Sequence, residues 1–149
     1  MYQYSYDTPI GKLYIAEKND TIIKVSFFPV FNEEKETSLI KETYNELCEY
    51  FKGQRITFNI PISLQGTEFQ LKIWQELSKI PYGETRCYKN IACAVGNPKA
   101  SRAVGLANNK NPIAIIIPCH RVIGSNGNLT GYAGGLDKKL QLLKLERIL

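Results

Sequence analysis

The sequence places a cysteine, Cys119, directly before the only histidine of the chain, His120, where an apolar run gives way to a glycine-rich stretch. A cysteine is nucleophilic as its thiolate, and a histidine is a common base that removes the thiol proton. In an extended chain, neighbouring side chains point to opposite faces, so His120 would need a sharp turn or a bridging water to reach Cys119. Cysteine hydrolases usually bring the two residues together from distant parts of the sequence, so the adjacency argues against a hydrolase. On this pair alone, Cys119 could also be a buried structural cysteine.

The elements around Cys119 can be read from local patterns. The apolar run 113–117 predicts a buried strand or extended segment, and catalytic groups often lie where such an element gives way to a loop. Thr67 and Gln70 have the spacing of a capping box and predict the start of a helix, with apolar residues at helical spacing as far as Ile80.

Two short helices are expected between these elements. Residues 88–95 predict a helix ended by Gly96, and Asn97 with Pro98 at the first helical position predicts the start of a second. Two helices joined by so tight a turn are typical of a helix-turn-helix. The second helix has mostly small side chains and one long basic one, Arg102, which favours a helix pressed into a nucleic-acid groove. Tight packing of an alanine-rich helix on its neighbours is the alternative interpretation.

The first part of the chain predicts a scaffold. Apolar and polar residues alternate over 2–28, with turns at Thr8-Pro9 and Asn19-Asp20, which predicts antiparallel strands. A helix is expected over about 34–51, and a further strand over 55–62. The change in periodicity and charge that follows places a domain boundary between residues 62 and 63.

Charge is distributed unevenly between these two parts. Residues 1–62 contain 7 Lys and Arg against 9 Asp and Glu, a balance of −2, whereas residues 63–149 contain 12 against 5, a balance of +7. Such asymmetry suggests that the basic part meets a polyanion. A solvated basic surface would have the same composition, so charge alone does not decide between the two.

Composition excludes several classes of protein. No stretch approaches the roughly 20 apolar residues that span a bilayer, and the first residues lack the pattern of a secretory signal. We therefore expect a protein of the cytoplasm, or of the nucleus in a eukaryote, where thiols stay reduced. Cys48, Cys87 and Cys93 are expected to be small buried side chains. With one histidine and no C-x-x-C pair, the sequence predicts no metal site.

The sequence around Cys119 also carries a longer pattern. "PCHRV" (118–122) is followed by "GYAGG" (131–135) and "KKLQLLKLE" (138–146). With the stretches "GTEFQLKIWQELSKIPYGET", "YKNIACAVGNPKASRAVG" and "NPIAIIIPCHRV" before it, this pattern resembles the O6-alkylguanine-DNA alkyltransferases, also called methylated-DNA–protein-cysteine methyltransferases. The resemblance covers residues 63–149 without large gaps. Residues 1–62 are similar to the family only in their mixed pattern of strands and helices.

The resemblance implies an α+β fold. A small mixed α/β domain with ribonuclease H-like strands and a helix would occupy residues 1–62. A mainly helical, winged-helix-like domain with a helix-turn-helix would occupy residues 63–149 and bind DNA. Without a cofactor or metal, it would act on double-stranded DNA that contains O6-alkylguanine. The protein would be a monomer with no membrane association, and the resemblance leaves cooperative binding along DNA open.

The resemblance also implies a reaction. In the family, an SN2-like step moves the alkyl group, chiefly methyl, from O6-alkylguanine to a cysteine that is not regenerated, and O4-alkylthymine is a further candidate substrate. Cys119 matches the acceptor, and His120 matches the residue that draws the thiol proton through a bound water. Glu146 matches the carboxylate that orients the histidine. Tyr88 matches the tyrosine that donates to guanine, and Asn111 the asparagine that ties the recognition helix to the active-site turn.

Further positions match the family's DNA contacts. Arg102 matches the arginine that fills the space left by the flipped nucleotide, on a helix that enters the minor groove. The small side chains on that helix suit a groove about 6 Å wide. The positions expected at the DNA are Lys89, Asn97, Ala100, Ser101 and Ser125. Those expected at the base pocket are Pro118, Tyr132, Ala133 and Gly134.

Two departures and two alternatives accompany this hypothesis. Ala133 stands where some members carry a serine, so backbone amides would have to bond the guanine oxygen. Some members hold zinc in the first domain, but this chain lacks the residues for it. A damage-binding relative without the acceptor cysteine is opposed by Cys119 itself. A helix-turn-helix transcription regulator would leave "PCHRV" unexplained.

Overall fold

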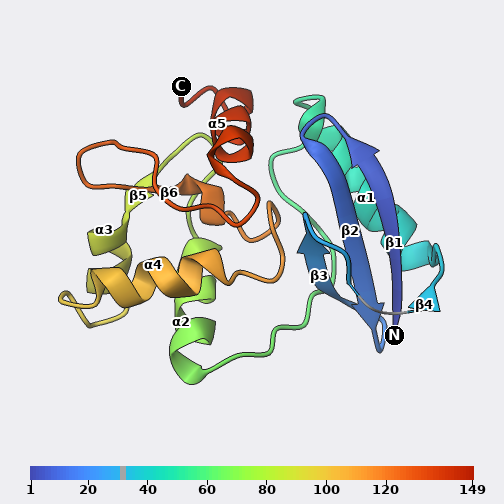
Figure 1. The fold of residues 1–149 in the computed structure, drawn as a ribbon, viewed down its shortest axis with the longest axis horizontal. Helices are drawn as coiled ribbons and strands as arrows, with labels where there is room; N and C mark the ends of the chain where they lie inside the picture. Colours follow the sequence, from blue (N-terminus) through green and yellow to red (C-terminus); the bar gives the residue numbers. More distant parts are fainter. Residues whose placement is uncertain (31–32) are drawn as a thin grey trace. The chain divides into compact units, whose positions relative to one another are not determined.

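The computed structural model describes residues 1–30 and 33–149, which form two compact units (Figure 1). The first unit contains residues 1–64 and 112–114, and the second contains residues 65–111 and 115–149. The first unit therefore extends two residues beyond the boundary expected between 62 and 63. It also includes residues 112–114 from late in the sequence.

Four strands of the first unit form one sheet in the order β3-β2-β1-β4. They are β1 (Tyr2–Thr8), β2 (Gly11–Lys18), β3 (Thr21–Ser26) and β4 (Glu33–Glu34). β1, β2 and β3 pair antiparallel in sequence order, whereas β4 pairs parallel to β1. Asn19 and Asp20 connect β2 to β3 with φ angles of 53° and 62°, the backbone of a type I′ hairpin turn. The antiparallel strands predicted for residues 2–28 are confirmed.

One helix, α1 (Ser38–Phe51), covers a face of this sheet (Figure 1). The Thr37 hydroxyl caps the helix by accepting a hydrogen bond from the Ile40 amide at 3.1 Å, so α1 begins later than the expected residue 34. Fully buried apolar side chains from the helix and the sheet form the core of the unit: Leu13, Ile15, Ile22, Ile40, Leu47 and Tyr50.

The strand predicted for residues 55–62 is wrong. These residues form no strand, and only Ile62 bridges to Ile22 of β3. The Asn59 amide instead donates to Glu46 of α1 at 2.8 Å, and Pro61 has no amide to donate. The segment therefore contacts α1 near its middle and the edge strand β3 only at its end, where the Ile22 amide donates to the Pro61 carbonyl at 2.9 Å.

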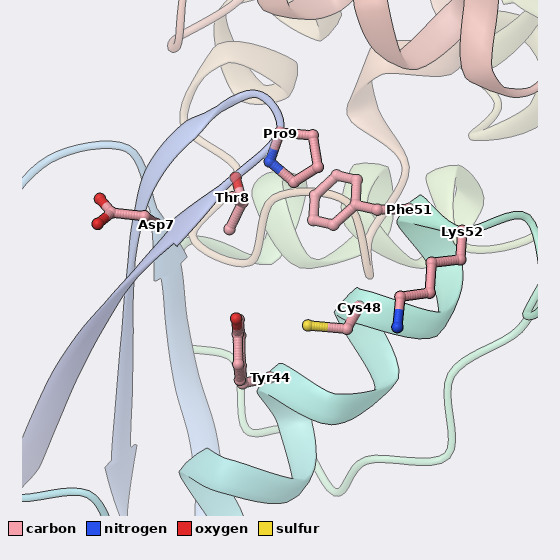
Figure 2. A pocket seen from close by; sticks show the side chains of 7 residues that line it. All are labelled: Asp7, Thr8, Pro9, Tyr44, Cys48, Phe51 and Lys52. Atoms are coloured by element: carbon pink, nitrogen blue, oxygen red, sulfur yellow. The ribbon is translucent and has the colours of Figure 1, made fainter.

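A hollow of about 180 Å³ lies between α1 and the turn that joins β1 to β2 (Figure 2). Figure 2 shows Tyr44, Cys48 and Phe51 of α1 on one side and Thr8 and Pro9 of the turn on the other. Hydrogen bonding to Cys48 raises the pKa of Tyr44, which shows that the thiol interacts within its own helix. Cys48 is half-buried, and so is Cys87, while Cys93 is exposed, so the expectation that all three are buried is wrong.

The second unit is mainly helical. Its helices are α2 (Glu68–Leu77), α3 (Tyr88–Ala94), α4 (Ser101–Asn109) and α5 (Leu136–Leu145), with one 3₁₀ turn, η1 (Cys119–Arg121). The capping box predicted at Thr67 and Gln70 is confirmed, with reciprocal hydrogen bonds of 3.0 and 3.1 Å. Trp74 of α2 donates to the Ala107 carbonyl of α4 at 2.9 Å, which joins these two helices.

A tight turn joins α3 to α4, and the two helices contact each other (Figure 1). Gly96 follows α3 with a φ of 83°, a conformation that suits glycine. The predicted start of the next helix is wrong, because α4 begins at Ser101 after Ala100 rather than after Asn97. The Ala100 amide donates to the Asn97 carbonyl at 3.0 Å, so Asn97 and Pro98 belong to the connecting turn.

A two-stranded parallel sheet connects α3 to the Cys119 turn. β5 (Arg86–Cys87) pairs with β6 (Val122–Ile123), and its register places Arg86 beside Val122. Of the strand or extended segment expected over 113–117, Ile113 bridges in parallel to Val25 of β3, but Ile115 has a φ of 71° and interrupts the extended backbone. Within the described ranges 1–30 and 33–149, no helix has the length and apolar character to cross a membrane.

Candidate active site

The turn η1 carries the adjacent cysteine and histidine, Cys119 and His120. The Arg121 amide donates to the Pro118 carbonyl at 3.0 Å, and the Cys119 amide donates to the Ile117 carbonyl at 2.8 Å. Both Cys119 and His120 are buried, with exposed fractions of 5% and 0%. The backbone at Cys119 is therefore sharply bent rather than extended, which is one of the two conditions that the sequence analysis set for cooperation between the two side chains.

His120 is held by a buried carboxylate. Its Nε2 atom lies 2.6 Å from Oε2 of Glu146, the C-cap residue of α5. Because a carboxylate only accepts, this contact assigns the imidazole proton to Nε2 and leaves Nδ1 as an acceptor. Nδ1 is buried, and no residue that the structure describes hydrogen-bonds to it. Burial lowers the pKa of His120 although Glu146 opposes this, so the ring is a neutral base.

Glu146 is fixed in turn by Arg121. The guanidinium donates to both carboxylate oxygens, from Nε at 2.8 Å and from Nη2 at 3.0 Å, and its Nη1 donates to the Ile80 carbonyl at 2.7 Å. The Gly83 amide also donates to Glu146, at 3.2 Å. A bidentate ion pair of this kind restricts the carboxylate to one orientation. The imidazole of His120 is consequently held in one position and one tautomer.

Cys119 is a thiol at neutral pH in this environment. Burial raises the pKa of Cys119 to about 11, while a hydrogen bond from the Asn111 side chain and the positive charge of Lys139 favour the thiolate. Asn111 also donates to the Ile117 carbonyl at 2.8 Å, so its side chain links the end of α4 to the segment before Cys119. Nucleophilic chemistry at Cys119 therefore requires a base.

Tyr88, the first residue of α3, reaches the loop after β6. Its hydroxyl donates to the Thr130 carbonyl at 3.1 Å and accepts from the Thr130 hydroxyl at the same distance. The pairing of Cys87 with Ile123 fixes the backbone before Tyr88 relative to the Cys119 turn. A phenol, a buried thiol and a carboxylate-held imidazole are thus gathered in one unit.

Comparison with known proteins identifies this arrangement. Residues 68–148 match the family model described as "6-O-methylguanine DNA methyltransferase, DNA binding domain", and residues 1–64 match "6-O-methylguanine DNA methyltransferase, ribonuclease-like domain". The chain belongs to the 6-O-methylguanine DNA methyltransferase family. Its two units carry the two domains of that family, so the mixed α/β fold followed by a DNA-binding domain is confirmed.

Individual relatives resemble nearly the whole chain. A methylated-DNA–protein-cysteine methyltransferase of Methanosarcina acetivorans is 50% identical, with 98% of each chain covered. A constitutive enzyme of the same name from Bacillus subtilis is 49% identical, covering 99% of this chain and 96% of the relative. The crystal structure of Mycobacterium tuberculosis OGT in complex with DNA has a TM-score of 0.93 at 42% identity, covering 99% of this chain and 93% of that one.

The residues that the family resemblance placed at DNA lie in the second unit of this methyltransferase. Arg102 is exposed on α4, next to the exposed Ala103, as a groove-facing helix requires. Ala107, also on α4, is buried and its carbonyl accepts the Trp74 hydrogen bond, so this small side chain packs inside the unit. Of the other positions expected at the DNA, Lys89, Asn97 and Ser125 are exposed and Ala100 and Ser101 are half-buried.

The expected pocket residues of the methyltransferase occupy two segments. Pro118 is buried directly before Cys119. The other three lie in the loop before α5, where Tyr132 and Gly134 are half-buried and Ala133 is exposed. No group of three or more potential metal ligands occurs in the part of the chain that the structure describes.

Sequence reasoning missed two buried residues of the methyltransferase site. Lys139 of α5 is completely buried. It donates to the backbone carbonyl of Val122, before the 124–131 loop, and to those of Thr130 and Gly131, at the end of that loop. Asn108 of α4 is also buried and donates to the Cys119 carbonyl at 3.3 Å. Lys139 precedes Leu142, Leu143 and Glu146 by three, four and seven residues. This spacing on one helical face could have revealed it as an inward-facing lysine.

Proposed function

We propose that this chain repairs DNA by transferring the alkyl group of O6-alkylguanine to Cys119, once per protein molecule. The observation that carries the proposal is the buried Glu146–His120 pair in the turn that bears Cys119. Membership in the 6-O-methylguanine DNA methyltransferase family supports the same substrate and the same reaction. The charge of the second part of the chain, +7, suits a DNA partner.

The reaction begins with loss of the thiol proton. A water between Cys119 and Nδ1 of His120 would carry the proton to the imidazole, and the Glu146 carboxylate would stabilise the imidazolium that forms. The Cys119 sulfur then attacks the alkyl carbon from the side opposite the guanine oxygen. The sulfur–carbon bond forms as the carbon–oxygen bond breaks, and both electrons of the broken bond remain on guanine.

Guanine leaves easily only if its developing negative charge is neutralised. Tyr88 would donate the proton, and the position of its hydroxyl at the loop that precedes the expected pocket residues supports this role. The hydroxyl of Thr130 donates to the Tyr88 oxygen and would stabilise a phenolate. Tyr88 regains a proton from solvent and His120 releases one. The net result is that the thiol proton ends on guanine and the alkyl group ends on sulfur.

The alkylated base must leave the helical stack before it can reach a buried thiol. Extrusion of a nucleotide costs a few kcal/mol. Arg102 would fill the vacated space from α4, and the small Ala103 beside it would allow the helix to approach the minor groove closely. Lys89, Asn97, Ala100, Ser101 and Ser125 would contact the DNA around it.

The thioether product explains why the reaction occurs once. Removing the alkyl group from a thioether would require expulsion of a thiolate, which is a poor leaving group from carbon, so Cys119 stays alkylated. We also infer a reducing location, the cytoplasm or a eukaryotic nucleus, because the reaction needs Cys119 as a free thiol and the other three cysteines are also free.

The decisive experiment measures where the alkyl group goes. The protein is incubated with a duplex containing one O6-methylguanine, and its peptides are analysed by mass spectrometry. We expect one methyl group on the peptide that contains Cys119 and a stoichiometry near one per protein. Cys119→Ser should abolish the transfer, whereas Cys93→Ser, at an exposed cysteine, should not change it. Repeated turnover with an unmodified protein, or methylation at another cysteine, would contradict the proposal. A duplex with O4-methylthymine tests the second substrate.

A further inference from the structure

One buried charge near Cys119 has no part in the reaction described above. Lys139 of α5 has an exposed fraction of 0%. Its Nζ atom lies 2.6 Å from the Val122 carbonyl, 2.7 Å from the Thr130 carbonyl and 3.3 Å from the Gly131 carbonyl. Burial of an ammonium group is costly, so a lysine in such a position calls for a functional or structural reason.

The three carbonyls select the charged form of Lys139. An ammonium has three N–H donors, one for each carbonyl, whereas a neutral amine would turn its lone pair toward one of them. Burial opposes this and lowers the pKa of Lys139 to about 8, while negative charge on Cys119 raises it. Lys139 is therefore protonated at neutral pH, and its partners, being carbonyls, do not neutralise its charge.

The other ionisable groups of the site have hydrogen-bond or ion-pair partners of their own. His120 is neutral and hydrogen-bonds Glu146. The charge of Arg121 is paired with Glu146 through two hydrogen bonds. Tyr88 is bound to Thr130. Lys139, by contrast, is a cation held 2.6 Å from the carbonyl of Val122, the residue that directly follows the Cys119 turn, and its charge favours the Cys119 thiolate.

The position of Lys139 also links it to Tyr88. Val122 follows the Cys119 turn directly, whereas Thr130 and Gly131 precede the expected pocket residues, so one ammonium joins two walls of the site. The Thr130 carbonyl accepts from both Lys139 and the Tyr88 hydroxyl. If Tyr88 turns toward a bound base, this carbonyl stays hydrogen-bonded through Lys139. The cost of redirecting the phenol is correspondingly small.

We propose that Lys139 is a positioning residue of the alkyl-transfer site, which joins the Cys119 turn to the Thr130–Gly131 loop and supplies the buried positive charge against which the Cys119 thiolate forms. The part that concerns Tyr88 rests on the proposed function. The part that concerns the thiolate does not, since any electrophile that reaches Cys119 reports on it.

The first test therefore uses no DNA. Iodoacetamide alkylates the thiolate form of cysteine, and mass spectrometry of the peptide containing Cys119 separates its rate from those of the other cysteines. The rate is measured from pH 6 to pH 10 for the wild type, Lys139→Met, Lys139→Gln and Lys139→Arg. Lys144→Met, at an exposed lysine of the same helix, is the matched control.

Each protein should have its own pH profile. The wild-type rate should rise tenfold per pH unit up to about pH 8 and then level off, because Lys139 loses its charge above that pH, well below the Cys119 pKa of about 11. Lys139→Arg should keep rising through pH 8, because arginine stays charged. Lys139→Met and Lys139→Gln should react about tenfold more slowly at pH 7, without the bend, because a nearby cation lowers a thiol pKa by about one unit or more. Lys144→Met should match the wild type.

The wild-type profile keeps the proposal falsifiable if a variant does not fold. A wild-type rate that rises evenly through pH 8 would overturn the electrostatic part, as would a folded Lys139→Gln with the wild-type rate and bend. Circular dichroism and thermal melting identify which variants are folded.

The second test measures single-turnover methyl transfer from an O6-methylguanine duplex to Tyr88→Phe, Lys139→Gln and the double variant. If Lys139 acts through Thr130 on Tyr88, the double variant should be less impaired than the product of the two single effects. Independent effects would overturn the link to Tyr88. If wild-type protein transfers no methyl group while the iodoacetamide profile bends as expected, the proposed function fails and the role of Lys139 toward the thiolate stands.

Discussion

The Nε2 atom of His120 lies 2.6 Å from Oε2 of Glu146, and neither side chain is exposed to solvent. The same carboxylate receives two hydrogen bonds from Arg121. One buried acidic group therefore holds both the base of the proposed reaction and the cation beside it. The first prediction concerns this group.

Replacing the carboxylate should damage both stability and activity. In Glu146→Gln the amide cannot balance the buried Arg121 charge, and we expect a loss of about 3 kcal/mol in the free energy of unfolding. Methyl transfer should fall by more than the folded fraction does, because His120 loses its anionic partner. Urea denaturation and single-turnover rates measure the two effects. Glu84→Gln, at an exposed glutamate paired with Arg86, is the control and should be close to the wild type. A stable Glu146→Gln with full activity would contradict the arrangement.

The pKa of His120 predicts how stability depends on pH. In the unfolded chain His120 titrates near pH 6.5, and burial lowers its pKa in the folded protein. Between those two values the unfolded state binds more protons, so the free energy of unfolding should fall as the pH drops below about 6.5, by up to about 1.4 kcal/mol per unit. Above about pH 6.5 His120 is neutral in both states, so its full contribution to the free energy of unfolding is present. Because the chain has one histidine, His120→Gln should flatten the dependence between pH 5 and 7. Urea denaturation at a series of pH values measures it, and equal slopes in both proteins would refute the prediction.

Arg102 should matter for duplex DNA and much less for single strands. Arg102→Ala removes the side chain proposed to replace the flipped nucleotide, so transfer from duplex O6-methylguanine should slow by about tenfold or more. A single-stranded substrate needs little extrusion, and its rate should change much less. Lys110→Ala, at the exposed C-cap of α4, controls for lost positive charge and should weaken binding to both substrates similarly. Equal rate losses of Arg102→Ala on both substrates would argue against a role in base extrusion.

Two glycines of the second unit should respond oppositely to alanine. A Cβ on Gly66 would lie 2.8 Å from the ring of the buried Trp74, so Gly66→Ala should cost about 1–3 kcal/mol. A Cβ on Gly105, inside α4, would meet the Tyr88 ring at an ordinary 3.8 Å. Gly105→Ala should therefore raise the free energy of unfolding by about 0.5–1 kcal/mol, through its better helix propensity. Thermal and urea unfolding test both, and the same sign for the two variants would contradict the packing described.

Local chemistry made much of the fold predictable. The capping box at Thr67 and the hairpin turn at Asn19 and Asp20 depend on side chains and backbone within a few residues, so sequence patterns capture them. The strand predicted at 55–62 was wrong because the local pattern of residues cannot show that the Asn59 amide donates a hydrogen bond to Glu46, which is distant in sequence. The start of α4 failed because Asn97 and Pro98 suit a tight turn as well as a helix start.

The site was predictable where a motif extends over many residues. The resemblance named Cys119, His120 and Glu146, and the structure brings these three together, while their roles stay predictions. Lys139 was not predicted, because lysines are usually exposed. Its burial depends on backbone carbonyls of the 122–131 segment. Every residue has a backbone carbonyl, so the residue types in this segment do not indicate that a lysine binds there.

The short parallel pairing of β5 with β6 has a consequence for protein engineering. In this pairing Arg86 lies beside Val122 and Cys87 beside Ile123. The main-chain register therefore sets the distance between the backbone before Tyr88 and the backbone after the Cys119 turn. The spacing of Tyr88 and Cys119 is therefore largely independent of the side chains at 86, 87 and 123, none of which is fully buried. We expect position 87, the N-cap of α3, to accept serine, which would leave fewer competing thiols in a protein designed to be labelled at a single sulfur.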